Sequence, residues 1–303
     1  MKFGKLQSLE GVDFSLPPDR EEALLGLKKE GNTEPFQAFI GCPMWGNKGW
    51  VGKLYPKGTK AGKFLFHYSR AFNTIEMNTT HYRSPSEEQI RKWKDQVPTS
   101  FVFCPKIPQT ISHYGKLQNV SAQTTAFCNA ISLFEENLGC AFMQMHESFG
   151  PDKLQVLAEF LSNFTPDIPL AIEFRHEGWF QDHLLIPQLS ELLYHFRVSA
   201  VITDVAGRRD VLHTSMTSDI AMIRFVGNGL VPSDYQRVDT WVERLKMWRD
   251  RGLKDVYFFV HEPDDTFAPE MGTYVIEQLN AHLNLSIPLP SMVENSGTQM
   301  RLF

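Results

Sequence analysis

Pro169-Leu170-Ala171-Ile172-Glu173-Phe174-Arg175-His176 is an apolar run that ends in a carboxylate, a guanidinium and an imidazole. Side chains alternate between the two faces of a strand, so Glu173 and Arg175 share one face with Ala171 while the apolar residues between them form the other. We therefore predict a buried strand with one face that becomes charged toward its carboxyl end. Such an end is either a structural ion pair inside a core or the floor of a site built where strands end.

The rest of the chain repeats this alternation of strand and helix. The predicted strands are 36–42, 74–78, 101–107, 140–146, 168–175, 199–204, 220–226 and 256–261, and the predicted helices are 60–72, 85–97, 120–138, 151–164, 181–196, 233–251 and 267–283. This rhythm predicts an α/β fold, a TIM-barrel-like (β/α)8 domain. A doubly wound open sheet is the alternative, but the glycine fingerprint expected after its first strand is missing from 41–46.

Composition and length favour one domain. The chain has 303 residues, 42% of them hydrophobic, and no linker-like stretch interrupts its middle. We predict a polar N-terminal extension over 1–35, a barrel over 36–285 and a flexible tail over 286–303. A net charge of −5 excludes a surface that is basic throughout. With no signal-like or membrane-length apolar run, the sequence predicts a cytoplasmic protein, and its four widely spaced cysteines predict reduced core thiols.

In seven of the eight predicted strands, the polar residues at the carboxyl end lie on one face, the face that would point into the barrel. The predicted inward set is Glu76, Asn78, Lys106, Gln144, His146, Glu173, Arg175, Asp204, Arg224 and His261. Burying so many ionisable groups is costly, which favours a ligand site over a purely structural network. Carboxylates mixed with fixed cations suit an anionic, phosphorylated substrate, which the cations hold while a carboxylate or a histidine moves a proton.

Each group has a predicted role. Glu173, Asp204 and Glu76 are the predicted catalytic residues, and the predicted substrate-binding residues are Arg175, Lys106, Arg224, Asn78, Tyr82, Gln144 and Trp45. Trp45 belongs to an aromatic loop after the first strand that either stacks on a base or sugar or caps the barrel. A divalent metal is a further option, with His146, His261, Glu173 and Asp204 as candidate ligands, although no H-E-x-x-H motif occurs.

Four segments carry a family resemblance. They are 40–46 (IGCPMWG), 72–83 (FNTIEMNTTHYR), 101–106 (FVFCPK) and 172–180 (IEFRHEGWF). With them the chain resembles the DUF72, or YecE-like, family over about residues 38 to 285. The resemblance implies a TIM-barrel-like fold and no established activity. The chain departs from the usual family pattern at 144–147 and 260–262, the segments that contain His146 and His261.

The C-terminal tail ends in Gln299, Leu302 and Phe303 with the spacing Gln-x-x-Leu-Phe. This spacing resembles the peptide by which bacterial proteins dock on the replication sliding clamp, where a polar lead delivers two apolar anchors to a pocket. The alternative is that the two apolar residues fold back on the barrel. Clamp docking would favour a DNA-related substrate.

Two functional hypotheses follow from the sequence. The first is a hydrolase-type enzyme that acts on an anionic, phosphorylated substrate at the carboxyl ends of the strands, with a DNA-processing role as its specific version. The second is a non-catalytic adaptor that binds a nucleotide or a nucleic acid.

Overall fold

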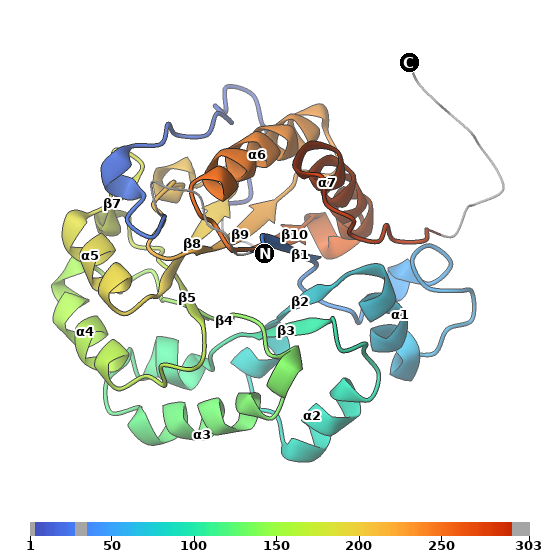
Figure 1. Ribbon diagram of the computed structural model, residues 1–303, viewed down its shortest axis with the longest axis horizontal. Coiled ribbons are helices and arrows are strands. Elements are labelled where there is room, and N and C mark those ends of the chain that lie inside the picture. Colours follow the sequence, from blue (N-terminus) through green and yellow to red (C-terminus); the bar gives the residue numbers. More distant parts are fainter. Residues whose placement is uncertain (1–3, 28–34, 293–303) are drawn as a thin grey trace.

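The computed structural model describes residues 4–27 and 35–292. Eight parallel strands curl around a common centre, and helices cover their outer side (Figure 1). These strands are β1 (Gln37–Gly41), β2 (Thr74–Met77), β3 (Val102–Pro105), β4 (Ala141–Gln144), β5 (Leu170–Glu173), β8 (Ser199–Asp204), β9 (Ile220–Val226) and β10 (Asp255–His261). Each lies within a predicted strand or extends one residue beyond it, because short buried β-branched and aromatic runs favour that conformation.

The strands form two parallel sheets. One has the order β1-β10-β9-β8-β5-β4, and the other pairs β2 with β3. Backbone hydrogen bonds span both gaps between the sheets: Glu76 N donates to Cys42 O (3.2 Å) at one gap, and Ile107 N donates to Phe142 O (2.7 Å) and Gly139 N to Phe103 O (2.8 Å) at the other. The first strand pairs with the last, so the doubly wound alternative is wrong. The fold is an α/β fold with a curled parallel sheet.

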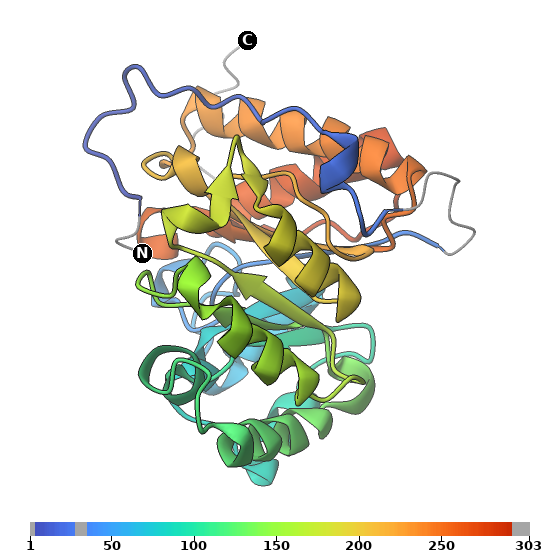
Figure 2. The same ribbon diagram turned by 90° about the vertical axis from the view of Figure 1, so that its left-hand side faces the viewer.

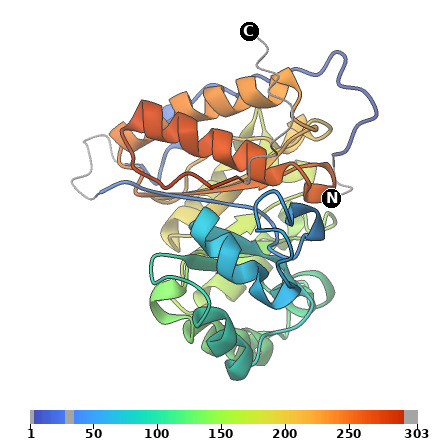
Figure 3. The same ribbon diagram turned by 90° about the vertical axis from the view of Figure 1, so that its right-hand side faces the viewer.

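The helices lie between successive strands. They are α1 (Phe64–Ala71), α2 (Glu87–Lys94), α3 (Ser121–Ser132), α4 (Leu154–Ser162), α5 (Pro187–His195), α6 (Pro232–Asp250) and α7 (Ala268–Leu283). Local sequence explains several of their starts: the Ser86 hydroxyl accepts a hydrogen bond from Gln89 N, and proline occupies the first turn of α5, α6 and α7. Helices α6 and α7 pack side by side, and α7 packs against β10 and β1 (Figure 3).

Three predicted helices differ from the structure at their ends. The helix predicted over 181–196 starts only at Pro187, because Asp182 and His183 adopt positive φ in a hairpin of β6 (Phe180–Gln181) and β7 (Leu184–Leu185). The helix predicted over 120–138 stops at Ser132, before positive φ at Glu135. In the helix predicted over 60–72, the first turn is a 3-10 helix. Isolated left-handed residues interrupt helices that side-chain spacing alone would continue.

The two faces of the curled sheet bury different apolar clusters. On the inner face Phe142, Met222 and Phe259 pack together, whereas the outer face packs residues such as Ile202 against Trp241 and the other helices. All four cysteines are buried and unbridged, so the predicted core thiols are confirmed. The inner apolar cluster fills the centre of the curl below the polar strand ends. It therefore forms a packed floor beneath the site.

The N-terminal segment packs against the rest of the fold. Figure 2 shows it running along α6. The Asp19 carboxylate accepts hydrogen bonds from Arg244 Nη1 (2.8 Å) and Trp248 Nε1 (3.0 Å), both on α6, and Gly4 O accepts one from Gly207 N (2.9 Å). Within it Glu21–Ala23 form a single 3-10 turn.

None of the helices in residues 4–27 and 35–292 combines the length with the apolar character that a membrane span requires.

Candidate functional site

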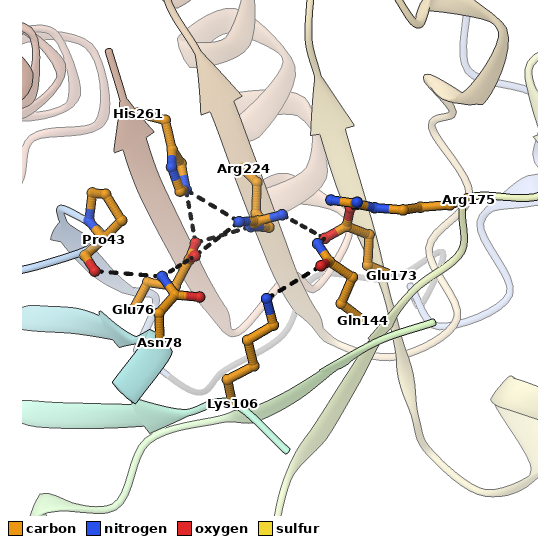
Figure 4. A network of polar contacts seen from close by, with 9 residues as sticks. All are labelled: Pro43, Glu76, Asn78, Lys106, Gln144, Glu173, Arg175, Arg224 and His261. Atoms are coloured by element: carbon orange, nitrogen blue, oxygen red, sulfur yellow. Dashed lines mark hydrogen bonds and ion pairs between the residues drawn. The ribbon is translucent and has the colours of Figure 1, made fainter. Parts of the chain in front are cut away.

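The centre of the site is the guanidinium of Arg224, at the inner face of β9 (Figure 4). Its Nε and Nη2 atoms donate to the two carboxylate oxygens of Glu76 on β2, at 2.9 and 2.8 Å. Its Nη1 atom donates to Glu173 Oε2 on β5, at 2.5 Å. All three side chains are at most 1% exposed. Arg224 therefore joins strands from both sheets, and both carboxylates neutralise it.

The Glu173 side of the network leads to two more cations. Arg175 Nε donates to Glu173 Oε1 (2.8 Å), and Gln144 Nε2 donates to Glu173 Oε2 (2.8 Å). The oxygen of the same Gln144 amide accepts a hydrogen bond from Lys106 Nζ at 3.2 Å. Gln144 thus lies between the Lys106 ammonium and the Glu173 carboxylate, which do not contact each other. These two partners fix the orientation of the Gln144 amide.

On the other side of the network, Glu76 holds His261 and Asn78. His261 Nε2 lies 2.9 Å from Glu76 Oε2, and Asn78 Nδ2 donates to Glu76 Oε1 at 2.8 Å. A carboxylate only accepts hydrogen bonds, so the imidazole carries its proton on Nε2. Arg224 Nη2, at 3.5 Å from the same nitrogen, is a much weaker contact. The Nδ1 atom of His261 has no hydrogen bond to any described residue.

Charge in the network fixes the protonation of both carboxyl groups. Burial alone would raise the pKa of Glu76, but Arg224 and His261 outweigh it and hold that pKa well below its usual value. Burial would likewise raise the pKa of Glu173, but Arg175 and Arg224 outweigh burial, and this pKa is also lowered. Both groups are ionised at neutral pH. They are fixed anions that accept hydrogen bonds.

Lys106 is the exception in this network, because it is buried without a carboxylate partner. It is 7% exposed, and among the described residues no carboxylate lies within 4.0 Å of its ammonium. Burial, followed by repulsion from Arg224, lowers the pKa of Lys106 to about 8. The protein therefore keeps a buried positive charge there at a cost in stability.

Asp204 does not join the network, and its predicted inward orientation is wrong. The side chain points to the outer face, where it accepts hydrogen bonds from Trp241 Nε1 (2.8 Å) and Arg237 Nε (3.3 Å) of α6 and pairs with Arg209. These two arginines outweigh the effect of burial, and the pKa of Asp204 is lowered. Asp204 therefore fastens α6 to the end of β8.

The inward residue at the end of β8 is Thr203. It is in register with Arg224 on the neighbouring strand and is 2% exposed. Its hydroxyl has no hydrogen-bond partner among the described residues, which is rare for a buried polar atom. Two polar residues end this strand, and the sequence alone gave no signal to choose between their faces.

Two predicted substrate-binding residues lie outside the network. Trp45 is half-buried and packs edge-on against Trp93 of α2, with ring centroids 5.9 Å apart. Tyr82 is 74% exposed, beside the ring of His81. Trp50, in the same loop as Trp45, is fully buried and donates from Nε1 to Asp265 O. The loop therefore packs as a hydrophobic cap, with Trp45 at its edge.

The candidate metal ligands do not converge. Glu173 and Asp204 lie on opposite faces of the sheet, and His146 Nδ1 accepts a hydrogen bond from Ser148 N within its own loop (3.1 Å). In the described ranges no three His, Cys, Asp or Glu side chains are grouped closely enough to hold a metal ion. The four candidate ligands therefore do not come together as a single metal centre.

A pocket of about 350 Å³ opens beside the network, between the N-terminal segment and the ends of β9 and β10. Its lining includes His261, Glu262, Asp265, Asn228 and the segment 4–7. Burial raises the pKa of Glu262 to about 7, even though Gly229 N donates to its Oε2 atom at 2.8 Å. The second oxygen of Glu262 is buried and has no partner among the described residues. Sequence reasoning missed this pocket because residues 4–7 show no motif.

The predicted clamp-docking residues Gln299, Leu302 and Phe303 lie outside the described residues.

Comparison with known proteins gives one family. The model of the family described as "Protein of unknown function DUF72" matches residues 39–294. The UPF0759 protein YecE of Escherichia coli K12 is 28% identical over 277 residues, which cover 86% of this chain and 98% of that protein. The UPF0759 protein YunF of Bacillus subtilis 168 is 26% identical over 149 residues, covering 47% of this chain and 52% of YunF.

Solved structures show the same fold. Two crystal structures of a DUF72 family protein from Enterococcus faecalis V583 each match with a TM-score of 0.64, at 20% and 21% sequence identity. They cover 87% and 84% of this chain and the whole of the matched chains. The family match spans the curled sheet and every residue of the network around Arg224, and on this ground the chain belongs to the DUF72 family.

Proposed function

We propose that the protein is a hydrolase-type enzyme that binds an anionic, phosphorylated substrate at the carboxyl ends of its strands. The observation that carries this proposal is the buried ammonium of Lys106, which among the described residues has only the amide oxygen of Gln144 as a hydrogen-bond partner. A buried charge without a counter-ion is unfavourable, and a ligand anion would supply the missing partner. Arg175, at 16% side-chain exposure, is the next cation along the network and the second proposed contact.

Arg224 has a different role in this proposal. Both of its carboxylate partners are present in the protein, so it has no charge left for a ligand. Arg224 with Glu76 and Glu173 forms a rigid floor that positions Lys106, Gln144 and Arg175. We further infer that the two sheets act as one closed (β/α)8 barrel, supported by the backbone hydrogen bonds that span both gaps.

Replacing Lys106 by methionine tests the proposal. Methionine fills similar space without the charge, so we expect the dissociation constant for inorganic phosphate, measured by calorimetry, to rise at least about tenfold. Thermal stability should not fall, because a costly buried charge is removed. Phosphate release from a panel of phosphate monoesters should fall in parallel.

The matched control is Lys92→Met, since Lys92 is exposed on α2 and forms only a surface ion pair with Glu88. Unchanged phosphate binding by the Lys106 variant would contradict the proposal. A large loss of stability would instead assign Lys106 to the structural network.

The tail supports a second proposal, docking on the replication sliding clamp, from the spacing of Gln299, Leu302 and Phe303 alone. On this proposal the protein is either a DNA-related enzyme or a non-catalytic adaptor that binds a nucleotide or a nucleic acid. The test compares clamp recovery by the full chain with that by a Leu302→Ala, Phe303→Ala variant. Equal recovery would reject docking through the tail.

A further inference from the structure

The pocket beside the network has a lining that is specific in its chemistry. Its polar side chains include Asn228, His261, Glu262 and Asp265, and the wall opposite them is the segment 4–7. That segment adds Lys5 and Gln7, so the lining offers both hydrogen-bond donors and acceptors. At about 350 Å³ the pocket lies within the range of small-molecule sites.

His261 connects this pocket to the proposed anion site. Its Nε2–H points to Glu76 at 2.9 Å, and its Nδ1 atom has no hydrogen-bond partner among the described residues. The ring is 5% exposed and lines the pocket. Glu76 therefore holds the orientation of His261, as carboxylates do for functional histidines.

The walls of the pocket are tightly fitted. A Cβ atom at Gly227 would lie 2.0 Å from Glu262 Oε1, so only glycine admits the Glu262 carboxyl group at that position. On the opposite wall Gly4 has a φ of +69°, and a Cβ there would lie 2.8 Å from Val205 Cγ2. Glycine thus allows close approach on both sides of the pocket. The packing of the N-terminal segment therefore forms one wall of the pocket.

We propose that this pocket binds the hydroxylated part of the substrate, a sugar or another polyol, with His261 Nδ1 accepting a hydrogen bond from one of its hydroxyl groups. The proposal rests on the proposed function in one respect, that the phosphate of the same molecule contacts Lys106. A hydroxyl group can donate a hydrogen bond to Nδ1 and can accept one from a donor in the same lining.

The test follows the ¹⁵N signals of the histidine side chains during titration with three probes: inorganic phosphate, ribose and ribose 5-phosphate. We expect the two ribose probes to shift the His261 Nδ1 signal, because the signal of a ring nitrogen responds to a new hydrogen bond. In calorimetry, the dissociation constant of ribose 5-phosphate should be lower than that of phosphate by a factor of about five or more, which corresponds to one net hydrogen bond.

His261→Gln supplies the decisive variant. The Gln amide can still donate to Glu76 but lacks the Nδ1 acceptor, so the preference for ribose 5-phosphate over phosphate should disappear while phosphate binding stays. His282→Gln, on the outer surface of α7, is the matched control and should keep the preference.

The outcomes separate the two proposals. If neither ribose probe shifts His261, or if His261→Gln keeps the preference, the pocket proposal is overturned whether or not phosphate binds. If ribose shifts His261 but phosphate does not bind, the pocket stands and the anion site fails.

Discussion

Replacing Glu262 by glutamine should change how the stability of the protein depends on pH. In the unfolded chain this carboxyl group titrates near its usual value of 4.5, whereas burial raises the pKa in the folded protein to about 7. Between these two pH values the folded state holds a proton that the unfolded state has released. The contribution of Glu262 to the free energy of unfolding is therefore largest at low pH and is lost as the pH rises through about 7.

The size of the effect follows from the difference between the two pKa values. Each pKa unit corresponds to about 1.4 kcal/mol, so ionising the folded carboxyl group costs on the order of 3 kcal/mol above pH 7. Glutamine resembles the protonated acid in shape and does not ionise. We expect Glu262→Gln to be close to wild type in urea unfolding at pH 4.5, and more stable by up to about 3 kcal/mol at pH 8.

The control is Glu277→Gln, because Glu277 is exposed on α7 and should leave the pH dependence unchanged. Asp234, Asp265 and Arg237 also act on Glu262, so the comparison with wild type is made at each pH separately. If the two proteins lose stability equally between pH 4.5 and 8, the folded carboxyl group does not hold its proton. Burial would then not be the dominant influence on the Glu262 carboxyl group.

Three other predictions concern the network and its neighbour. Thr203→Val should raise the free energy of unfolding by up to about 1 kcal/mol, because it removes a buried hydroxyl without a partner; a loss in urea unfolding would reveal a hydrogen bond there. Phosphate affinity measured by calorimetry should fall as the pH rises through about 8, where Lys106 loses its charge, and constant affinity from pH 7 to 9 would exclude Lys106. Arg224→Met should destabilise by about 3 kcal/mol or more, since it leaves Glu76 and Glu173 buried without their main partner; a small change in urea unfolding would contradict the role of Arg224 as the floor.

The alternation of side chains along each strand predicted most of the network, because the polar residues at most strand ends lie on one face only. Glu76, Gln144, Glu173 and Arg224 all project inward as predicted. The end of β8 has two consecutive polar residues, Thr203 and Asp204, which lie on opposite faces of the strand. The apolar residues before them are buried on both faces. A strand of a parallel sheet covered on both sides has no exposed face to mark its orientation. The partners that hold Asp204 on the outer face decide it: Arg209, five positions along the chain, and Arg237 and Trp241 of α6, which are 33 and 37 positions away.

The N-terminal segment shows a second limit of local patterns. Its sequence is polar and predicts an extension, yet Asp19 contacts α6 more than two hundred positions along the chain (|i−j| = 225). Residues 4–7 become a wall of the pocket only because Gly4 meets Gly207. Contacts between segments so far apart in sequence leave no periodicity to read.

Lys106 and Arg224 are both buried cations in one network, yet the structure assigns them opposite effects on stability. Arg224 satisfies two carboxylates, so its removal leaves uncompensated charge. Lys106 satisfies only an amide, so its removal relieves a charge that burial disfavours. A network that existed only for stability would gain nothing from Lys106. The unfavourable ammonium is therefore the feature that separates a ligand site from a structural ion pair, and it stands next to the carboxylate–guanidinium pair that ends β5.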